Sequence, residues 1–336
     1  MGTRSGRAVV VGCLWGLVGL PPLATATESD WSAIAAARVS YTTDVFQFSA
    51  ARRLAISDDP SQPTVVQLGQ PDDVIWEPSV DLTRTFSTGL GRNEVSVKAH
   101  GFLYTNNPIF NHGDYRIQTK QWIGADTSIL LRYRYVPNLF LGPNVERQSG
   151  LQMVAEERVT SHRWRLEVER RLSEAWRITG IGRYGLRFYN AQFSERDTWF
   201  FTVGPKVEYT PISWATATLG YLYERGLADG RNEPQFQDDV SYYLNVVSFG
   251  TEFRFSPSVS LNLVYTYLRK NFTSGIPGDT HMGRLDQTNQ GLAELSYLLT
   301  PASQVTLRFQ RTQRTSTNAL RDFNDSIISI GGDYRF

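Results

Sequence analysis

The chain has little of what many enzymes and nucleic-acid-binding proteins depend on. Its 336 residues include one cysteine and four histidines, and 34 Lys and Arg stand against 33 Asp and Glu. One cysteine excludes disulfide scaffolds and cysteine zinc sites. The nearly equal numbers of positive and negative residues give the chain no overall charge that would attract nucleic acid. No apolar run reaches the roughly 18 residues that a membrane-spanning helix needs, so a helical membrane protein is also excluded.

The first 26 residues have the three parts of a secretory signal peptide. A short basic segment, Met1–Arg7, precedes the apolar run Ala8–Leu20, and the small residues Ala24 and Ala26 form a cleavage site. The sequence therefore predicts export across the inner membrane and cleavage after Ala26. Because Cys13 lies in the segment that is removed, a cysteine nucleophile is excluded as well.

Beyond residue 36 the dominant pattern is an alternation of apolar and polar residues. In the segment 259–270, VSLNLVYTYLRK, the odd positions from Val259 to Tyr267 are apolar or aromatic and the even positions are mostly polar. The segments 176–189 and 214–225 show the same alternation. A period of two is typical of a β-strand with one apolar and one polar face, so the chain is predicted to be all-β.

Six short breaks and seven longer polar connections divide these segments into 14 strands. The breaks are 88–93, 124–128, 172–175, 210–213, 256–258 and 300–303. The longer connections are 50–73, 106–113, 137–155, 191–196, 226–239, 271–286 and 315–323. The last three breaks are near copies that each contain Pro and Ser, a composition typical of tight turns. Short and long connections would therefore alternate along the chain.

This organisation is typical of a transmembrane antiparallel up-and-down β-barrel. Such barrels have an even number of strands, short turns at one end and long loops at the other. Lipid allows no unpaired sheet edge, so the sheet must close on itself. The predicted parts are a signal peptide over 1–26, a short N-terminal periplasmic segment over 27–35 and an outer-membrane β-barrel over 36–336.

The polar face of the predicted barrel carries a concentration of positive charge on four adjacent strands. Alternation places these residues toward the lumen: Arg116, Lys120, Arg132, Arg134, Arg163, Arg165, Arg183 and Arg187. The later strands instead mix Glu208, Glu252 and Glu294 with Lys206, Arg254 and Arg308. One wall of the lumen is therefore predicted to be basic and the other mixed.

The width of the barrel favours an open pore. A barrel of 14 strands is wider than the eight-strand kind that side chains fill, and charges in its lumen would set selectivity. The alternative is that the basic residues pair with Glu167, Glu169, Glu77 and Asp81 and plug the interior. The long connection 137–155 either folds inward to narrow the channel or packs on its neighbours.

The sequence holds no convincing catalytic, cofactor or metal site. Ser161 and His162 are neighbours on one strand and must point to opposite faces, and His100 has no evident nucleophile beside it. The acidic pairs 58–59, 72–73 and 238–239 are interpreted as solvated loop charges. We therefore expect no enzyme activity, no cofactor and no metal.

The last eight residues, SIGGDYRF, carry the most specific motif. Ser329, Gly331, Tyr334 and the terminal Phe336 match the pattern polar-x-Gly-x-x-aromatic-x-aromatic. This segment resembles the assembly signal of Gram-negative outer-membrane proteins, and the strand pattern resembles that of porin-like barrels. The resemblance implies residence in the cell outer membrane, contact with its lipid and lipopolysaccharide, and recognition by the barrel assembly machinery during biogenesis.

Three functions are consistent with these observations. The favoured one is a pore for passive diffusion of small hydrophilic solutes, with a preference for anionic ones because of the basic wall. The second is a non-transport structural or surface-adhesion barrel with a plugged lumen. The third is a channel for hydrophobic substrates. Fatty-acid channels with 14 strands begin with a long plug, and the short segment 27–35 counts against this third function.

The terminal motif leads to a first prediction. Deletion of Phe336 should lower the amount of assembled barrel, since the motif then lacks its last aromatic residue. Cell fractionation with quantification of the detergent-resistant outer-membrane fraction measures the effect. An unchanged amount of assembled protein, or a chain that is soluble in the periplasm before any change, would contradict it.

Overall fold

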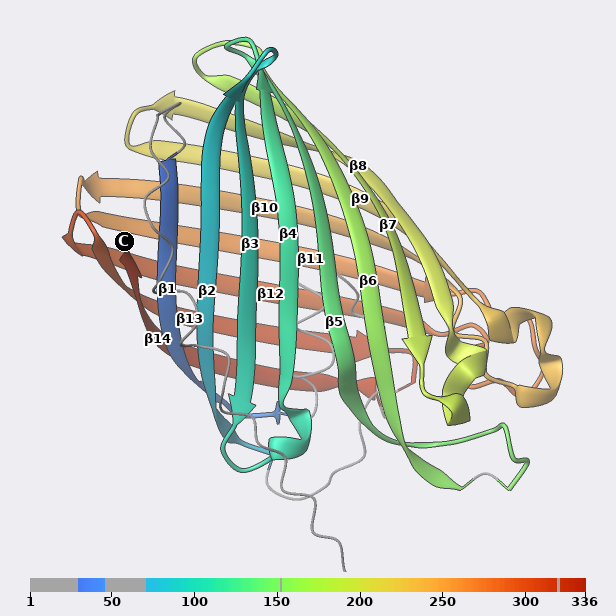
Figure 1. The fold of residues 1–336 in the computed structure, drawn as a ribbon. Coiled ribbons are helices and arrows are strands. Elements are labelled where there is room, and N and C mark those ends of the chain that lie inside the picture. Colours follow the sequence, from blue (N-terminus) through green and yellow to red (C-terminus); the bar gives the residue numbers. More distant parts are fainter. Residues whose placement is uncertain (1–29, 46–70, 152, 319–320) are drawn as a thin grey trace, which may run out of the picture.

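The computed structural model describes residues 30–45, 71–151, 153–318 and 321–336. In these residues fourteen strands form one closed antiparallel barrel (Figure 1). The strands are β1 (Asp30–Thr42), β2 (Asp73–Thr88), β3 (Gly91–Tyr104), β4 (His112–Ile123), β5 (Thr127–Val145), β6 (Val154–Arg171), β7 (Trp176–Tyr189), β8 (Thr198–Ile212), β9 (Ala215–Ala228), β10 (Tyr242–Ser256), β11 (Val259–Phe272), β12 (Leu285–Thr300), β13 (Ser303–Ser316) and β14 (Phe323–Arg335). The all-β barrel of 14 strands predicted from the sequence is confirmed.

The first strand begins at Asp30, so the predicted start of the barrel at residue 36 was wrong. The segment 33–37, AIAAA, has small or apolar residues on both faces, which hides the period of two. Pairing decides the structure there instead, because Ile34 pairs with Asp81 of β2 and with Arg335 of β14. The predicted signal peptide, 1–26, and residues 27–29 lie outside the described residues.

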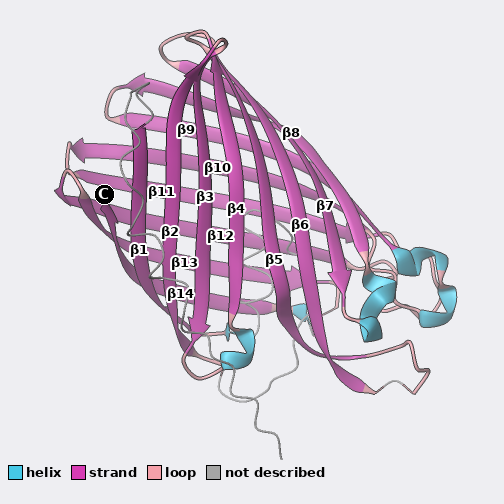
Figure 2. Cartoon of the chain, viewed as in Figure 1, coloured by secondary structure: helices cyan, strands magenta, loops and turns pink. Residues whose placement is uncertain are grey.

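Tight turns and longer connections lie at opposite ends of the barrel, called here the turn end and the loop end. The six predicted short breaks all join consecutive strands at the turn end. The loop end carries the short 3-10 helices η2 (Pro108–Phe110), η3 (Ala191–Arg196), η4 (Asp229–Asn232) and η5 (Pro234–Phe236), drawn in cyan in Figure 2. Among the described residues no helix is long and apolar enough to cross a membrane.

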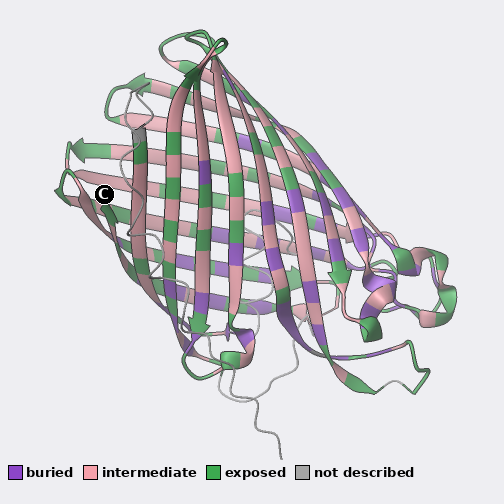
Figure 3. Ribbon diagram, in the orientation of Figure 1, coloured by how far each residue is buried: buried purple, intermediate pink, exposed green. Residues whose placement is uncertain are grey.

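The outer face of the barrel is apolar. Along each strand exposed side chains alternate with less exposed ones (Figure 3), and the exposed ones include Trp76, Leu131 and Leu219. An apolar surface that surrounds the whole barrel far exceeds the few hundred Å² that a soluble monomer exposes. Lipid therefore surrounds this face. The mean hydropathy of the whole chain is still only −0.32, because alternate residues face a polar lumen.

The C-terminal motif lies at the seam where the barrel closes. Ser329 faces inward and accepts a hydrogen bond from Ser40 Oγ at 2.9 Å, while the rings of Tyr334 and Phe336 face outward with centroids 4.8 Å apart. The backbone N–H of Phe336 donates to the Ala33 carbonyl at 2.9 Å. Three residues of the motif thus belong to β14, which pairs with both β1 and β13, and Phe336 directly follows it.

The connection predicted over 137–155 is mostly strand. β5 continues to Val145 and β6 begins at Val154, so the two form a hairpin that extends beyond the barrel rim (Figure 1). Two register shifts, next to Leu139 and Phe140, bend the hairpin. Leu139 and Phe140 are buried, and this packing rather than alternation determines the local structure, which is why the sequence pattern was interpreted as a loop.

The register of the strands leads to a second prediction. Leu219 faces outward and its neighbour Thr218 lines the lumen. Leu219→Arg should lower the free energy of unfolding by about 2–4 kcal/mol, the cost of arginine on the lipid face near the midplane. Thr218→Arg, the matched control, should change it little. Denaturant unfolding in lipid vesicles measures both, and equal costs would refute the register.

Candidate functional site

All eight predicted basic residues lie on the inner face of strands β4 to β7. Six of them form two rows that run across the strands, each residue directly opposite the next in the pairing register. The rows are Arg116–Arg134–Arg163 and Arg132–Arg165–Arg183. Lys120 lies nearer the turn end and Arg187 nearer the loop end. We call these eight residues the basic wall.

Such rows cost stability unless something offsets them. Residues directly opposite in an antiparallel pair have their Cβ atoms about 4.5–5.5 Å apart, and like charges at that separation destabilise the sheet. Three consecutive arginines in one row repeat this cost at each step. The arrangement is therefore a poor way to stabilise a barrel and indicates a function.

Four carboxylates lie among the basic residues and offset part of their charge. Asp114 Oδ2 is 2.6 Å from Arg116 Nη2, and Asp114 Oδ1 accepts a hydrogen bond from Arg134 Nε at 2.8 Å. The other three pairs are Arg165–Glu167 at 2.6 Å, Lys120–Glu169 at 3.8 Å and Arg187–Glu224 at 3.9 Å. Eight cations against these four carboxylates leave an excess of four positive charges on the wall.

The carboxylates are only partly the ones expected from the sequence. Glu167 and Glu169 do pair with the basic wall, as the plugged alternative requires. Glu77 instead accepts a hydrogen bond from Ser40 and lies 3.6 Å from His100 Nε2, whereas Asp81 accepts one from Thr83. Sequence reasoning missed Asp114, although its spacing of two from Arg116 places both on one face.

The loop-end part of the wall is densely packed. Tyr242 Oη donates to Glu224 at 2.6 Å and accepts a hydrogen bond from Arg187 Nη1 at 3.0 Å. The Arg187 guanidinium also lies over the Phe200 ring, 4.1 Å from its centroid. A Cβ at Gly185 would overlap the Phe200 ring, so this packing requires glycine there. Arg187 is therefore held in a buried cluster and narrows the loop end.

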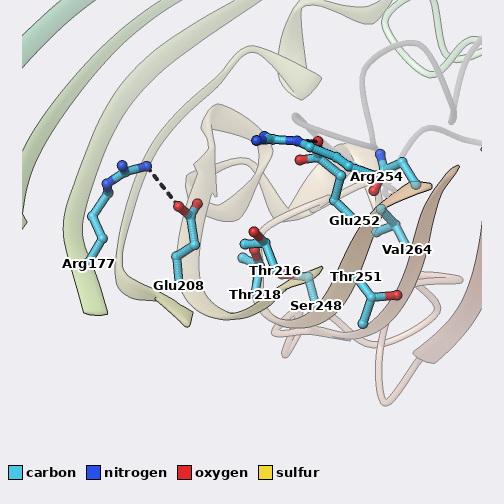
Figure 4. A pocket seen from close by; sticks show the side chains of 11 residues that line it. Arg177, Glu208, Thr216, Thr218, Ser248, Thr251, Glu252, Arg254 and Val264 are labelled. Atoms are coloured by element: carbon cyan, nitrogen blue, oxygen red, sulfur yellow. Dashed lines mark hydrogen bonds and ion pairs between the residues drawn. The ribbon is translucent and has the colours of Figure 1, made fainter. Parts of the chain in front are cut away.

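The opposite wall is mixed, as predicted. A cavity of about 360 Å³ near the turn end is lined by residues of β7 to β11 (Figure 4). Arg177 Nη1 donates to Glu208 at 2.7 Å and Arg254 Nε donates to Glu252 at 2.7 Å. Arg177 and Arg254 are each beside a carboxylate, so neither of them adds much net charge to the lumen.

The residues considered for catalysis lie as alternation predicts. Ser161 is on the inner face and His162 on the outer face, where its Nδ1 is 2.7 Å from Tyr133 Oη. His100 faces the lumen beside Glu77. The structure therefore does not bring Ser161 and His162 together into a catalytic pair.

Comparisons with known proteins agree with this architecture. A family model described as "Putative beta-barrel porin 2" matches residues 232–336, from the β9–β10 loop to the end. The solved structure of the outer membrane channel DcaP of Acinetobacter baumannii is similar over 92% of this chain and 97% of that one, with 7% identity and a TM-score of 0.53. The chain has the fold of an outer-membrane porin.

A second solved structure covers the barrel to a similar extent. It is the anion-selective porin from Comamonas acidovorans, with 7% identity over 92% of this chain and 99% of that one and a TM-score of 0.49. Among curated protein sequences no match was found. The closed barrel and its apolar outer face, together with the porin family model, set the chain in the lipid of the Gram-negative outer membrane.

Loops at the mouth of this porin-type barrel form a buried polar network. Arg196 of η3 donates to Glu157 Oε2 through Nη1 and to Asp238 Oδ2 through Nε, each at 2.7 Å. Asp238 and Asp239 are buried, so their interpretation as solvated charges was wrong, and Asp73 is buried as well. Loop packing excludes water there, which no local sequence pattern reveals. The acidic pair 58–59 lies outside the described residues.

The mouth network leads to a third prediction. Burial raises the pKa of Glu195 to about 7, whereas an unfolded glutamate titrates near 4.3. The folded loops therefore hold this proton more tightly. Their extra stability is complete below about pH 4 and is lost as the pH rises through about 7. Hydrogen exchange of residues 191–197 should be faster at pH 8 than its intrinsic pH dependence explains.

Two variants isolate this effect. Glu195→Gln has no carboxyl group to ionise, so hydrogen exchange of residues 191–197 should show no extra acceleration at pH 8. Comparing the variant with the unaltered chain at each pH cancels the intrinsic exchange rate. Glu156→Gln changes an exposed glutamate that pairs with Arg158 and should leave the acceleration in place. Identical pH profiles for the unaltered chain and the Glu195 variant would contradict the assignment.

Proposed function

We propose that the protein is an outer-membrane pore for passive diffusion of small hydrophilic solutes, with a preference for anions, rather than an enzyme. The observation that carries this proposal is the pair of arginine rows on one wall of the lumen. Like charges directly opposite in a sheet destabilise it, so their concentration on one inner wall is best explained by a solute that they attract.

The size of the barrel supports an electrostatic role for this wall. Fourteen strands spaced about 4.8 Å apart and tilted by about 40° give a backbone radius of about 14 Å. Screening in 0.1 M salt leaves the field of a charge effective over about 10 Å. An excess of four positive charges on one wall therefore acts over most of the lumen and concentrates anions along it.

The two walls together would orient a solute. The basic wall offers guanidinium groups, which bind carboxylates and phosphates in bidentate fashion. The mixed wall offers hydroxyl, amide and paired charged groups around the cavity of Figure 4. A small molecule with an acidic group at one end and hydroxyl groups elsewhere fits such a lumen.

The same proposal covers orientation and biogenesis. Outer-membrane barrels have short periplasmic turns and long extracellular loops, so the turn end, with Asp30 and Phe336, faces the periplasm. We infer that residues 1–26 direct export and that the segment 329–336 is read by the barrel assembly machinery. The outward rings of Tyr334 and Phe336 support this reading, because they are accessible from the side of the barrel.

A second candidate function has one observation in its favour. Arg187, Glu224 and Tyr242 form a buried cluster at the loop end, as expected of a barrel whose lumen is closed and whose role is structural. Single-channel conductance separates the two functions, since a closed barrel gives none.

The basic wall leads to a fourth prediction, tested in planar bilayers with a salt gradient. The unaltered pore should show a modest anion preference that fades at 1 M salt, where the screening length falls to about 3 Å. Changing both Arg132 and Arg183 to Glu should shift the reversal potential toward cations. Conductance is a poorer measure, because removing long side chains also widens the pore.

The opposite wall supplies the matched control. Arg254→Glu also reverses an arginine of the lumen, but one beside its own carboxylate, Glu252, and away from the basic wall. It should shift the reversal potential much less. Equal shifts, or no shift in the Arg132 and Arg183 variant, would refute a selective role for the basic wall.

A further inference from the structure

Three side chains suited to metal binding meet at the mouth of the barrel, outside the lumen. Asp238 belongs to the β9–β10 loop, and Asp279 and His281 belong to the β11–β12 loop. All three are at most 5% exposed. One ligating atom of each lies within 4.8 Å of the others. Two loops that are far apart in sequence thus present a nitrogen and two carboxylate oxygens to one point.

The distances fit a small metal ion. His281 Nδ1 is 3.0 Å from Asp279 Oδ1 and 3.6 Å from Asp238 Oδ1. Two atoms bound to a tetrahedral zinc ion at about 2.0–2.1 Å lie about 3.3–3.4 Å apart. These two distances bracket this value, and all three ligand atoms lie within 4.8 Å of one another.

Hydrogen bonds join only two of these three atoms, because Asp279 Oδ1 accepts from the His281 backbone N–H at 2.8 Å and lies 3.0 Å from His281 Nδ1. Nδ1 of a histidine carries at most one hydrogen, and Asp279 Oδ1 at 3.0 Å is the acceptor within reach. Asp238 Oδ1, at 3.6 Å from Nδ1, is too far away for a hydrogen bond. A cation between the three atoms would contact all of them at once.

Further buried acidic and basic groups surround the triad. Glu157 and Glu195 are also at most 1% exposed, and each has one carboxylate oxygen, Oε1, without a hydrogen-bond partner among the described residues. Arg196, which follows Glu195, contacts both Glu157 and Asp238. Arg196 thus links Glu157 to Asp238 and holds the Asp238 carboxylate beside His281.

Neighbouring groups already orient the ligands. Asp279 Oδ2 accepts hydrogen bonds from Ser274 Oγ at 2.6 Å and from the Asp239 backbone N–H at 2.9 Å. These bonds fix the carboxylate so that Oδ1 faces His281. The imidazole packs on the Phe272 ring, with centroids 4.9 Å apart. Supporting contacts of this kind are typical of metal sites and strengthen binding.

We propose that Asp238, Asp279 and His281 bind one divalent transition-metal ion of the zinc class, with water in the fourth position. Imidazole with carboxylates suits such ions, whereas calcium and magnesium prefer oxygen ligands alone. The ion would join the β9–β10 loop to the β11–β12 loop at the mouth, a role independent of whether the lumen conducts.

Zinc binding to the refolded full-length barrel in detergent, without a histidine tag, tests the proposal. Competition with a chromophoric chelator should show one zinc ion per chain, and cobalt should give the intense visible absorption of a tetrahedral site. His281→Gln and Asp238→Asn should each weaken zinc binding by about 100-fold or more, since even supporting residues contribute about 10–100-fold.

A control variant and a folding check make the result decisive. His112→Gln removes a histidine at the start of β4 and should keep the zinc affinity of the unaltered chain. The shift in gel mobility on heating shows that each variant is a folded barrel, and two independent ligand variants guard against misfolding of one. Equal affinity in the ligand and control variants, displacement of zinc by calcium, or no binding tighter than about 1 mM would overturn the proposal.

Discussion

Backbone hydrogen bonding in lipid is the constraint on which this structure depends. Lipid offers no partner to a peptide group, so every strand must pair on both sides and the sheet must close. The closing pair is β14 with β1, and the inward hydrogen bond between Ser40 and Ser329 lies within it. Closure divides each strand into an outer apolar face and an inner polar one, and all other features follow from this division.

Closure also concentrates charge in a confined space. Side chains that would spread into water on an open sheet face one another across the lumen, and the register places arginines of four strands in rows. Carboxylates such as Asp114 offset part of the charge, and aromatic rings such as Phe200 support individual guanidinium groups. The remaining positive charge gives the lumen its asymmetry, with a basic wall opposite a mixed one.

The loop end follows different rules from the membrane-embedded wall. Its loops leave the barrel and bury their polar groups against one another, with Arg196 joining Glu157 to Asp238. Burial of so many carboxylates makes the mouth sensitive to protons and to cations, whereas the wall is held by backbone pairing. The mouth can therefore respond to the medium outside while the barrel stays unchanged.

The sequence by itself determined the strand number, the turns and the inward position of the basic wall, because alternation with a period of two is a local property of each strand. It did not reveal that β1 begins at Asp30, where small residues hide the period, or that β5 and β6 extend as a hairpin held by the burial of Leu139. Nor did it show that Arg187 meets Tyr242, or that Asp238 meets His281. Those contacts join segments distant in sequence, and only the closure of the barrel and the packing of its loops bring them together.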